Sequence, residues 1–182
     1  MAVLPIPIEM VKRFSIEDYY RMRDHGLLSR HTELLDGVLV DRMTVSPKHT
    51  YIVSYLMNLL REILPKDLII SKENPITIGN SEPEPDISIV TGSLNDYKET
   101  HPTTAEWVIE VAISSLSLDL SKRKIYAEAK IPHYWTIDPE NNKILVFTEP
   151  KGEQYSSETI YGMQDEIPVP LIKDKSLNFK WI

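Results

Sequence analysis

Two carboxylates stand inside otherwise apolar segments of this 182-residue chain. Asp86 opens the segment that runs to Val90, and Glu110 interrupts the run from Trp107 to Ile113. A buried carboxylate is costly unless a cation or a proton donor satisfies it. The chain between the two acids is long enough for a strand, a loop and a return into an adjacent strand, so their side chains could lie close together. Because neighbouring carboxylates repel each other, the pair predicts a divalent cation, and hard oxygen ligands favour Mg²⁺ or Mn²⁺. Such an ion polarises a phosphate and lowers the pKa of a bound water.

Two further charged residues are candidates for the same site. Glu33 precedes a predicted tight turn and is placed to aim a third carboxylate at the pair. Lys122 is expected in the first turn of a helix, where its charge opposes the helix dipole by roughly 0.3–1 kcal/mol. A nearby carboxylate or phosphate would offset that cost. His49, at the start of another predicted helix, is expected to cap the helix or to make a partly buried hydrogen bond.

Each of the four charged residues also has a purely structural interpretation. Asp86 follows Pro85, as turn and cap residues often do. Glu110 is compatible with an edge strand facing solvent or with a Lys or Arg partner, and Glu33 with a solvated cross-strand pair. Lys122 opens a Lys-Arg-Lys run, which is typical of a solvated helix face. Only the set of four, taken together, favours a site.

Composition limits the classes of function. The net charge of −7 argues against tight binding of a polyanion by the monomer. Basic residues nonetheless gather in two places, Lys12, Arg13, Arg21 and Arg23 near the start and Lys122, Arg123, Lys124 and Lys130 later. With no cysteine, the chain has no disulfide, thiolate metal site or Cys nucleophile, which fits a cytoplasmic location. It has no Gly-rich phosphate loop and no Gly-x-Ser-x-Gly motif. We expect neither a signal peptide at residues 1–9 nor a membrane span.

The elements that must position these residues predict an α/β fold of one domain, residues 1–182, with a mixed central sheet flanked by helices. Ser15 is a predicted N-cap, Asp36-Gly37 predicts a type I′ hairpin turn, and Pro65 is expected to stop an amphipathic helix. The predicted helices cover residues 15–26, 49–64 and 119–130, with a short one within 92–104. The predicted strands cover residues 32–40 (a hairpin), 68–71, 76–78, 86–90, 107–113, 134–138 and 143–147, with short pieces in 155–182.

An ordered set of motifs extends from about Phe14 to Trp181. Its members are Glu33–Gly37, His49 at a helix start, Glu84–Val90, Trp107–Val111, Lys122–Ala129 and Ile131–Asp138. In this order the chain resembles the Uma-two (Uma2) family of restriction endonucleases, a branch of the PD-(D/E)xK nuclease superfamily. The resemblance implies a restriction-endonuclease-like core.

The resemblance also assigns residues. Asp86 matches the Asp of the Pro-Asp element, and Glu110 matches the acid of the second half-motif. The superfamily lysine usually lies two residues after that acid, where this chain has Ala112. The related family carries the lysine on the following helix, and Lys122 matches that place. Lys124 is the alternative, because the segment before the lysine is about one residue short of the family pattern.

The activity implied by the resemblance is Mg²⁺-dependent or Mn²⁺-dependent hydrolysis of DNA, in a protein that forms homodimers. Asp86, Glu110 and the Val111 carbonyl would bind the metal, with Glu33 as a further ligand or as a partner of the ligands. Lys122 would orient the attacking water. Two alternatives stay open, namely a non-catalytic nucleic-acid-binding or assembly module of the same fold, and a metal-dependent hydrolase of a small phosphorylated substrate.

Overall fold

A computed structural model describes residues 10–42, 46–113 and 115–182 of the chain. The first nine residues, where no signal peptide is expected, and Ser114 of the expected polar turn lie outside this part. The elements follow in the order α1 (Ile16–Asp24), β1 (Thr32–Leu35), β2 (Val38–Asp41), α2 (Pro47–Ile63), β3 (Ile69–Lys72), β4 (Ile87–Val90), β5 (Trp107–Val111), α3 (Leu116–Glu128), β6 (His133–Asp138), β7 (Lys143–Lys151), β8 (Gln154–Gly162), β9 (Ile167–Pro168) and β10 (Ser176–Leu177).

The central sheet has six strands in the order β3-β4-β5-β6-β7-β8. Strands β5 and β6 pair in parallel, and the other neighbours pair antiparallel. A parallel pair needs a crossover connection, and α3 provides it between β5 and β6. The mixed sheet with packed helices confirms the predicted α/β class.

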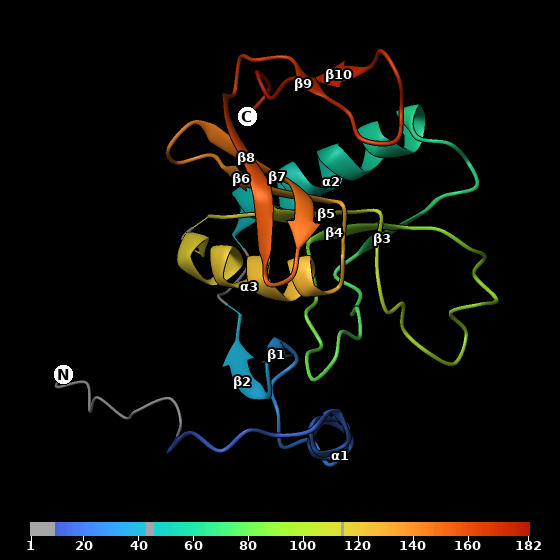
Figure 1. Ribbon diagram of the computed structural model, residues 1–182, viewed down its shortest axis with the longest axis vertical. Helices are drawn as coiled ribbons and strands as arrows, with labels where there is room; N and C mark the ends of the chain where they lie inside the picture. Colours follow the sequence, from blue (N-terminus) through green and yellow to red (C-terminus); the bar gives the residue numbers. More distant parts are fainter. Residues whose placement is uncertain (1–9, 43–45, 114) are drawn as a thin grey trace, which may run out of the picture.

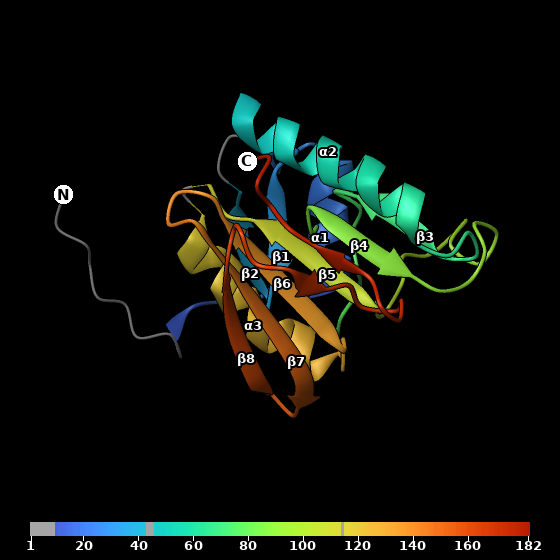
Figure 2. The same ribbon diagram turned by 90° about the horizontal axis from the view of Figure 1, so that it is seen from above.

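Helices cover both faces of the sheet, with α2 on one side and α3 on the other (Figure 2). Because side chains alternate along a strand, β5 sends residues to both layers. Trp107, Ile109 and Val111 belong to the core under α2, whereas Val108 belongs to the core under α3. By the same alternation Glu110 lies on the α3 face.

Local chemistry explains where the first two helices begin. The Ser15 side chain accepts from the Asp18 N–H, and the Asp18 carboxylate accepts from the Ser15 N–H, so α1 starts with a capping box. Helix α2 begins at Pro47, two residues before the predicted start, because Ser46 is its N-cap. His49 is therefore not the cap.

The third helix differs from the prediction in a way that matters for the site. It begins at Leu116 and not at Asp119. Lys122 consequently lies in the second turn, so its expected place in the first turn is wrong. The helix has no side-chain cap hydrogen bond at Ser115, which is why no cap motif in the sequence marked its start.

Two smaller predictions are also wrong. Residues 76–78 form no strand, because their N–H groups are satisfied elsewhere. Ile76 donates to the Pro83 carbonyl and Thr77 to the Pro102 carbonyl. The segment 92–104 contains no helix. It is a series of turns in which Asp96 accepts from the N–H and hydroxyl of Ser93, and such local bonds compete with helix formation.

The β1–β2 hairpin and α1 lie together at the end of the molecule opposite the β9–β10 pair, with α3 between (Figure 1). Strand β8 is longer than the predicted pieces of the tail and forms the sheet edge beside β7. Within the three described ranges, none of the helices combines the length and apolar character that a bilayer crossing requires.

Candidate active site

Asp86 and Glu110 face each other across two neighbouring antiparallel strands. In the β4–β5 ladder Ile87 pairs with Ile109, so the next residues outward are Asp86 and Glu110. The Asp86 N–H donates to Glu110 Oε2 at 3.0 Å, and the Val111 N–H donates to Asp86 Oδ2 at 2.7 Å. The two carboxylates that motivated the metal hypothesis are therefore brought together, on the α3 face and not on a solvated edge.

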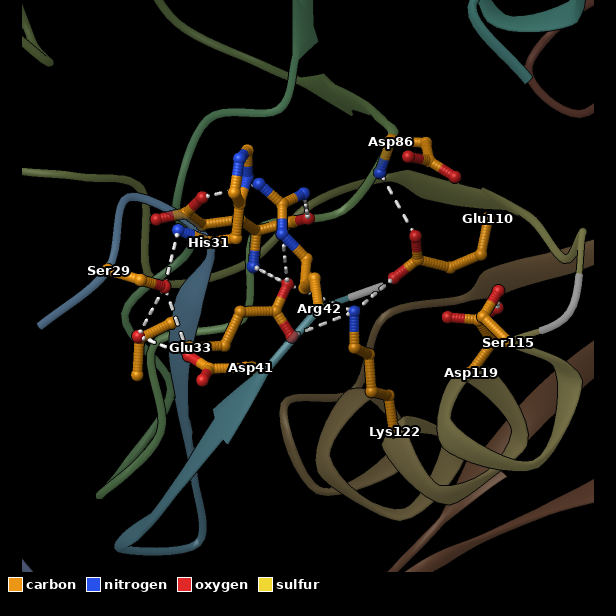
Figure 3. A network of polar contacts seen from close by, with 12 residues as sticks. Ser29, His31, Glu33, Asp41, Arg42, Asp86, Glu110, Ser115, Asp119 and Lys122 are labelled. Carbon is orange, nitrogen blue, oxygen red and sulfur yellow. Dashed lines mark hydrogen bonds and ion pairs between the residues drawn. The ribbon is translucent and has the colours of Figure 1, made fainter. Parts of the chain in front are cut away.

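Lys122 approaches this pair from α3. Its Nζ lies 3.0 Å from Glu110 Oε1 and 3.0 Å from Glu33 Oε2 (Figure 3). The residue is only 1% exposed, so it does not belong to a solvated helix face. Lys124 points elsewhere and pairs with Glu153 at an exposed position. Of the two candidate lysines, the structure places only Lys122 at the carboxylates.

Glu33 reaches the site because its hairpin docks on the segment before β4. The Gly37 N–H donates to the Asn80 carbonyl at 3.0 Å, and this fixes the hairpin tip. Further along, the Glu84 N–H donates to Glu33 Oε1 at 3.0 Å. Glu33 is fully buried and its carboxylate faces Lys122, so the solvated cross-strand interpretation does not hold.

Arg42 is a site residue that the sequence reasoning missed. Its Nη2 lies 2.9 Å from Glu84 Oε2, and its Nε lies 3.6 Å from Glu33 Oε1. Arg23 of α1 also pairs with Glu84, at 3.0 Å, so the network extends to the first helix. The hairpin register held a usable signal. Glu33 pairs with Val40, and a residue two positions on lies diagonally across from Glu33.

Asp119 is the second omission. It lies one turn before Lys122 on the same helix face, and its Oδ2 accepts from the Ser115 hydroxyl at 2.6 Å. Figure 3 shows it beside Glu110 and Lys122. The three-residue spacing was a possible signal. It was missed because the helix was predicted to begin at Asp119 itself.

Two more side chains complete the surroundings of the acidic pair. The Tyr126 hydroxyl donates to Glu110 Oε1 at 3.0 Å. His49 Nε2 lies 3.0 Å from Asp86 Oδ2, and since a carboxylate only accepts, Nε2 donates. The partly buried hydrogen bond expected for His49 is therefore present.

The electrostatics of the pocket reflect an excess of buried acids. Burial raises the pKa of Glu110 to about 8; Lys122 opposes this shift, and the charge of Asp86 adds to it. Burial likewise raises the pKa of Asp119, against the effect of Lys122. For Lys122 itself, burial lowers the pKa, but the charges of Glu110 and Glu33 outweigh burial and raise it above the ordinary value. Lys122 therefore stays positively charged. Its charge does not offset the burial of Glu110 and Asp119, whose pKa values remain raised.

A cavity of about 50 Å³ opens at this point. Its lining consists of Arg42, Ser46, His49, Asp86, Glu110, Val111, Ile113, Ser115, Leu118, Asp119 and Lys122. Among the described residues, no three His, Asp or Glu side chains form a cluster that would by itself enclose a metal. Mg²⁺ does not require such a cage, since it is usually bound through one or two carboxylates and keeps several waters.

The donor set fits Mg²⁺ or Mn²⁺ on these grounds. Asp86 and Glu110 both line the cavity and supply carboxylate oxygens. The Val111 carbonyl accepts from the Ile113 N–H at 3.1 Å and retains a second lone pair. Glu33 does not line the cavity, and its contacts are to Lys122, Glu84 and Arg42.

Comparisons with known proteins agree with this architecture. A crystal structure of "a putative nuclease belonging to DUF820 from Anabaena variabilis ATCC 29413" is similar with a TM-score of 0.69 and 18% identity, over 92% of this chain and 96% of that one. This likeness establishes the shared restriction-endonuclease-like fold. No curated protein matches the chain. The family model of Uma2, described as "Putative restriction endonuclease", matches residues 16–179. Family and fold thus point to a nuclease, and the chain belongs to the Uma2 family.

Proposed function

We propose that the protein is a divalent-metal-dependent endonuclease that hydrolyses phosphodiester bonds in DNA. One observation carries the proposal. Lys122 Nζ lies 3.0 Å from Glu110 Oε1, and Asp86 stands directly opposite Glu110 at the same cavity. The acidic pair would hold the metal ion, and that ion together with the fixed Lys122 ammonium would stabilise a phosphate that gains negative charge in the transition state.

Asp86, Glu110 and the Val111 carbonyl would hold Mg²⁺ or Mn²⁺. When bound, the ion supplies Lewis-acid charge beside the scissile phosphate. Lys122 has three N–H donors, and Glu33 and Glu110 accept two of them. The remaining donor would be available to an attacking water or a phosphate oxygen, while the charges of Glu110 and Glu33 favour the charged ammonium group.

The test is nicking of plasmid DNA in Mg²⁺ or Mn²⁺. Asp86→Asn keeps the shape of the side chain but removes its charge, and we expect it to lower the rate by at least about 100-fold. Asp67→Asn makes the same chemical change at an exposed position and serves as the control. Cleavage that persists in EDTA, or equal rates for wild type and Asp86→Asn, would refute the proposal.

A non-catalytic module of the same fold is the second candidate. It is favoured by the two ion pairs of Lys122, which compensate part of the buried charge without any metal, and by the net charge of −7. Calorimetry separates the two functions. A Mn²⁺ isotherm that is lost in Glu110→Gln supports the enzyme, whereas absence of binding together with intact DNA supports the module.

We further propose a homodimer in the cytoplasm. The dimer rests on the resemblance to the nuclease superfamily, and the location rests on the absence of cysteine. Sedimentation velocity measures the first directly. A monomer at micromolar concentration would contradict it.

A further inference from the structure

We propose that His49 is a positioning residue for Asp86, which it holds in the orientation needed to bind the divalent ion. This inference rests on the proposed metal-dependent function and adds a residue to it. His49 is assigned no contact with DNA and no role in proton transfer.

The geometry at Asp86 carries the inference. Two donors converge on one oxygen, Oδ2, which accepts from His49 Nε2 at 3.0 Å and from the Val111 N–H at 2.7 Å. Neither donor engages Oδ1. Two hydrogen bonds to the same oxygen fix the plane of the carboxylate, and Asp86 lines the cavity from this position. Without the ring, the Val111 N–H would be the one remaining hydrogen-bond donor to the carboxylate among the described residues.

His49 is itself held by an element separate from the acidic strands. It lies in the first turn of α2, where Ser46 Oγ accepts from the His49 N–H at 3.2 Å. Helix α2 is anchored in the core through buried residues such as Ile52 and Leu56. Helix α2 therefore holds the ring in place, and the ring in turn restrains a carboxylate at the start of β4.

The second ring nitrogen, Nδ1, argues against a space-filling role for His49. His49 Nδ1 is buried and has no hydrogen-bond partner among the described residues. Buried polar atoms are usually paired, because an unpaired one costs free energy. An apolar side chain would fill the same space without that cost. Within residues 10–42, 46–113 and 115–182, the hydrogen bond to Asp86 is the one side-chain polar contact of this ring.

Residues that hydrogen-bond to a metal-binding carboxylate contribute to metal affinity. Their removal typically weakens metal affinity by about 10- to 100-fold. We therefore expect a similar loss for a variant that keeps the volume of His49 but cannot donate. A glutamine should restore most of the affinity, because its amide N–H can reach the place of Nε2.

Isothermal titration of the full chain with Mn²⁺ alone provides the test, with His49→Leu, His49→Phe, His49→Gln and wild type compared. We expect Kd to rise about 10- to 100-fold in the Leu and Phe variants and to return to within a few-fold of wild type in His49→Gln. His31→Leu makes the same change at an exposed histidine and should bind as wild type does. Circular dichroism melts show which variants fold. Because two apolar variants and the Gln variant are included, the comparison can still be made if one variant does not fold.

The outcomes separate this inference from the function on which it rests. If wild type binds no Mn²⁺, both are overturned. If wild type binds, Asp86→Asn does not, and the Leu and Phe variants bind as wild type does, only the role of His49 is overturned. Loss of plasmid nicking at saturating Mn²⁺ with unchanged Kd would instead place His49 in the chemical step and overturn its positioning role.

Discussion

At the scale of single residues, one buried lysine forms ion pairs with two acids of the site. Lys122 lies within 3.0 Å of both Glu33 and Glu110, and all three are almost completely removed from water. Breaking a buried ion pair by removing one partner is strongly destabilising, because the other charge stays behind without compensation. Lys122 is therefore expected to contribute to folding as well as to chemistry.

Lys122→Met should lower the free energy of unfolding by about 3–5 kcal/mol, since among the described residues it leaves buried Glu110 without a cationic partner and Glu33 with only Arg42, at 3.6 Å. Lys124→Met, two residues further along the same helix and exposed, should leave stability nearly unchanged. Urea unfolding in EDTA measures both. Equal midpoints for Lys122→Met and wild type would show that the buried ion pairs contribute nothing to stability.

Stability in the absence of metal should also fall as the pH rises from about 4.5 to about 8. The pKa of Glu110 is raised by burial to about 8 in the folded chain, against an ordinary value of 4.5. Between these values the folded chain keeps a proton that the unfolded chain has lost, so each step upward in pH favours unfolding. The raised pKa of Asp119 acts in the same direction.

Urea unfolding at pH 5 and pH 8 in EDTA checks this pH dependence. Glu110→Gln should flatten it, because the glutamine has no proton to lose. Glu140→Gln, at an exposed position, should keep the slope of wild type. A Glu110→Gln slope as steep as that of wild type would mean that other groups cause the effect.

At the scale of elements, the hairpin turn places Glu33. Gly37 has φ +76°, and an added Cβ would lie 2.8 Å from Asn80 Nδ2 and 2.8 Å from Arg13 Cβ. Gly79 also has positive φ, +55°, but an added Cβ there would meet nothing within 4 Å. Alanine variants of the two glycines share the cost of a left-handed backbone, and only the Gly37 variant adds crowding. Their difference therefore measures the crowding.

Gly79→Ala should cost about 1–2 kcal/mol for the left-handed conformation alone. Gly37→Ala should cost about 1–3 kcal/mol more, because the methyl group also pushes the hairpin away from Asn80. Thermal or chemical denaturation gives both values. If the two variants are equally stable, the close approach at the hairpin tip carries no energetic weight.

Elements whose signals are local could be predicted from the sequence. The Asp36-Gly37 hairpin and helix α2 were predicted because turn chemistry and apolar periodicity act over a few residues. The start of α3 was not, since Ser115 makes no side-chain cap hydrogen bond. Residues 76–78 look like a strand, but the Ile76 and Thr77 N–H groups donate to the carbonyls of Pro83 and Pro102, which no local pattern reveals.

The site shows the same division. Asp86 and Glu110 stood out because carboxylates in apolar segments are costly, and the β4–β5 register brought them together. Arg42 was missed because its importance arises from contact with Glu84, a residue far away in the sequence. Asp119 was missed because of the wrong helix start.

At the scale of the whole molecule, the net charge of −7 includes several carboxylates buried near one cavity. Carboxylates buried around a cavity lower the net charge without adding charged groups to the outer surface. A divalent ion in the cavity would relieve repulsion between Asp86 and Glu110. It would therefore couple metal binding to the stability of the entire fold.

Mn²⁺ should accordingly raise the melting temperature of the protein. A ligand that binds only the folded chain, at 100 times its Kd, adds about 2.7 kcal/mol. For a chain of this size, that corresponds to an increase on the order of 5–10 °C. Asp86→Asn should abolish the increase, and Asp67→Asn should retain it. Melts in NaCl of equal ionic strength remove general screening, so an equal Mn²⁺ shift in Asp86→Asn would place the stabilising ion away from the cavity.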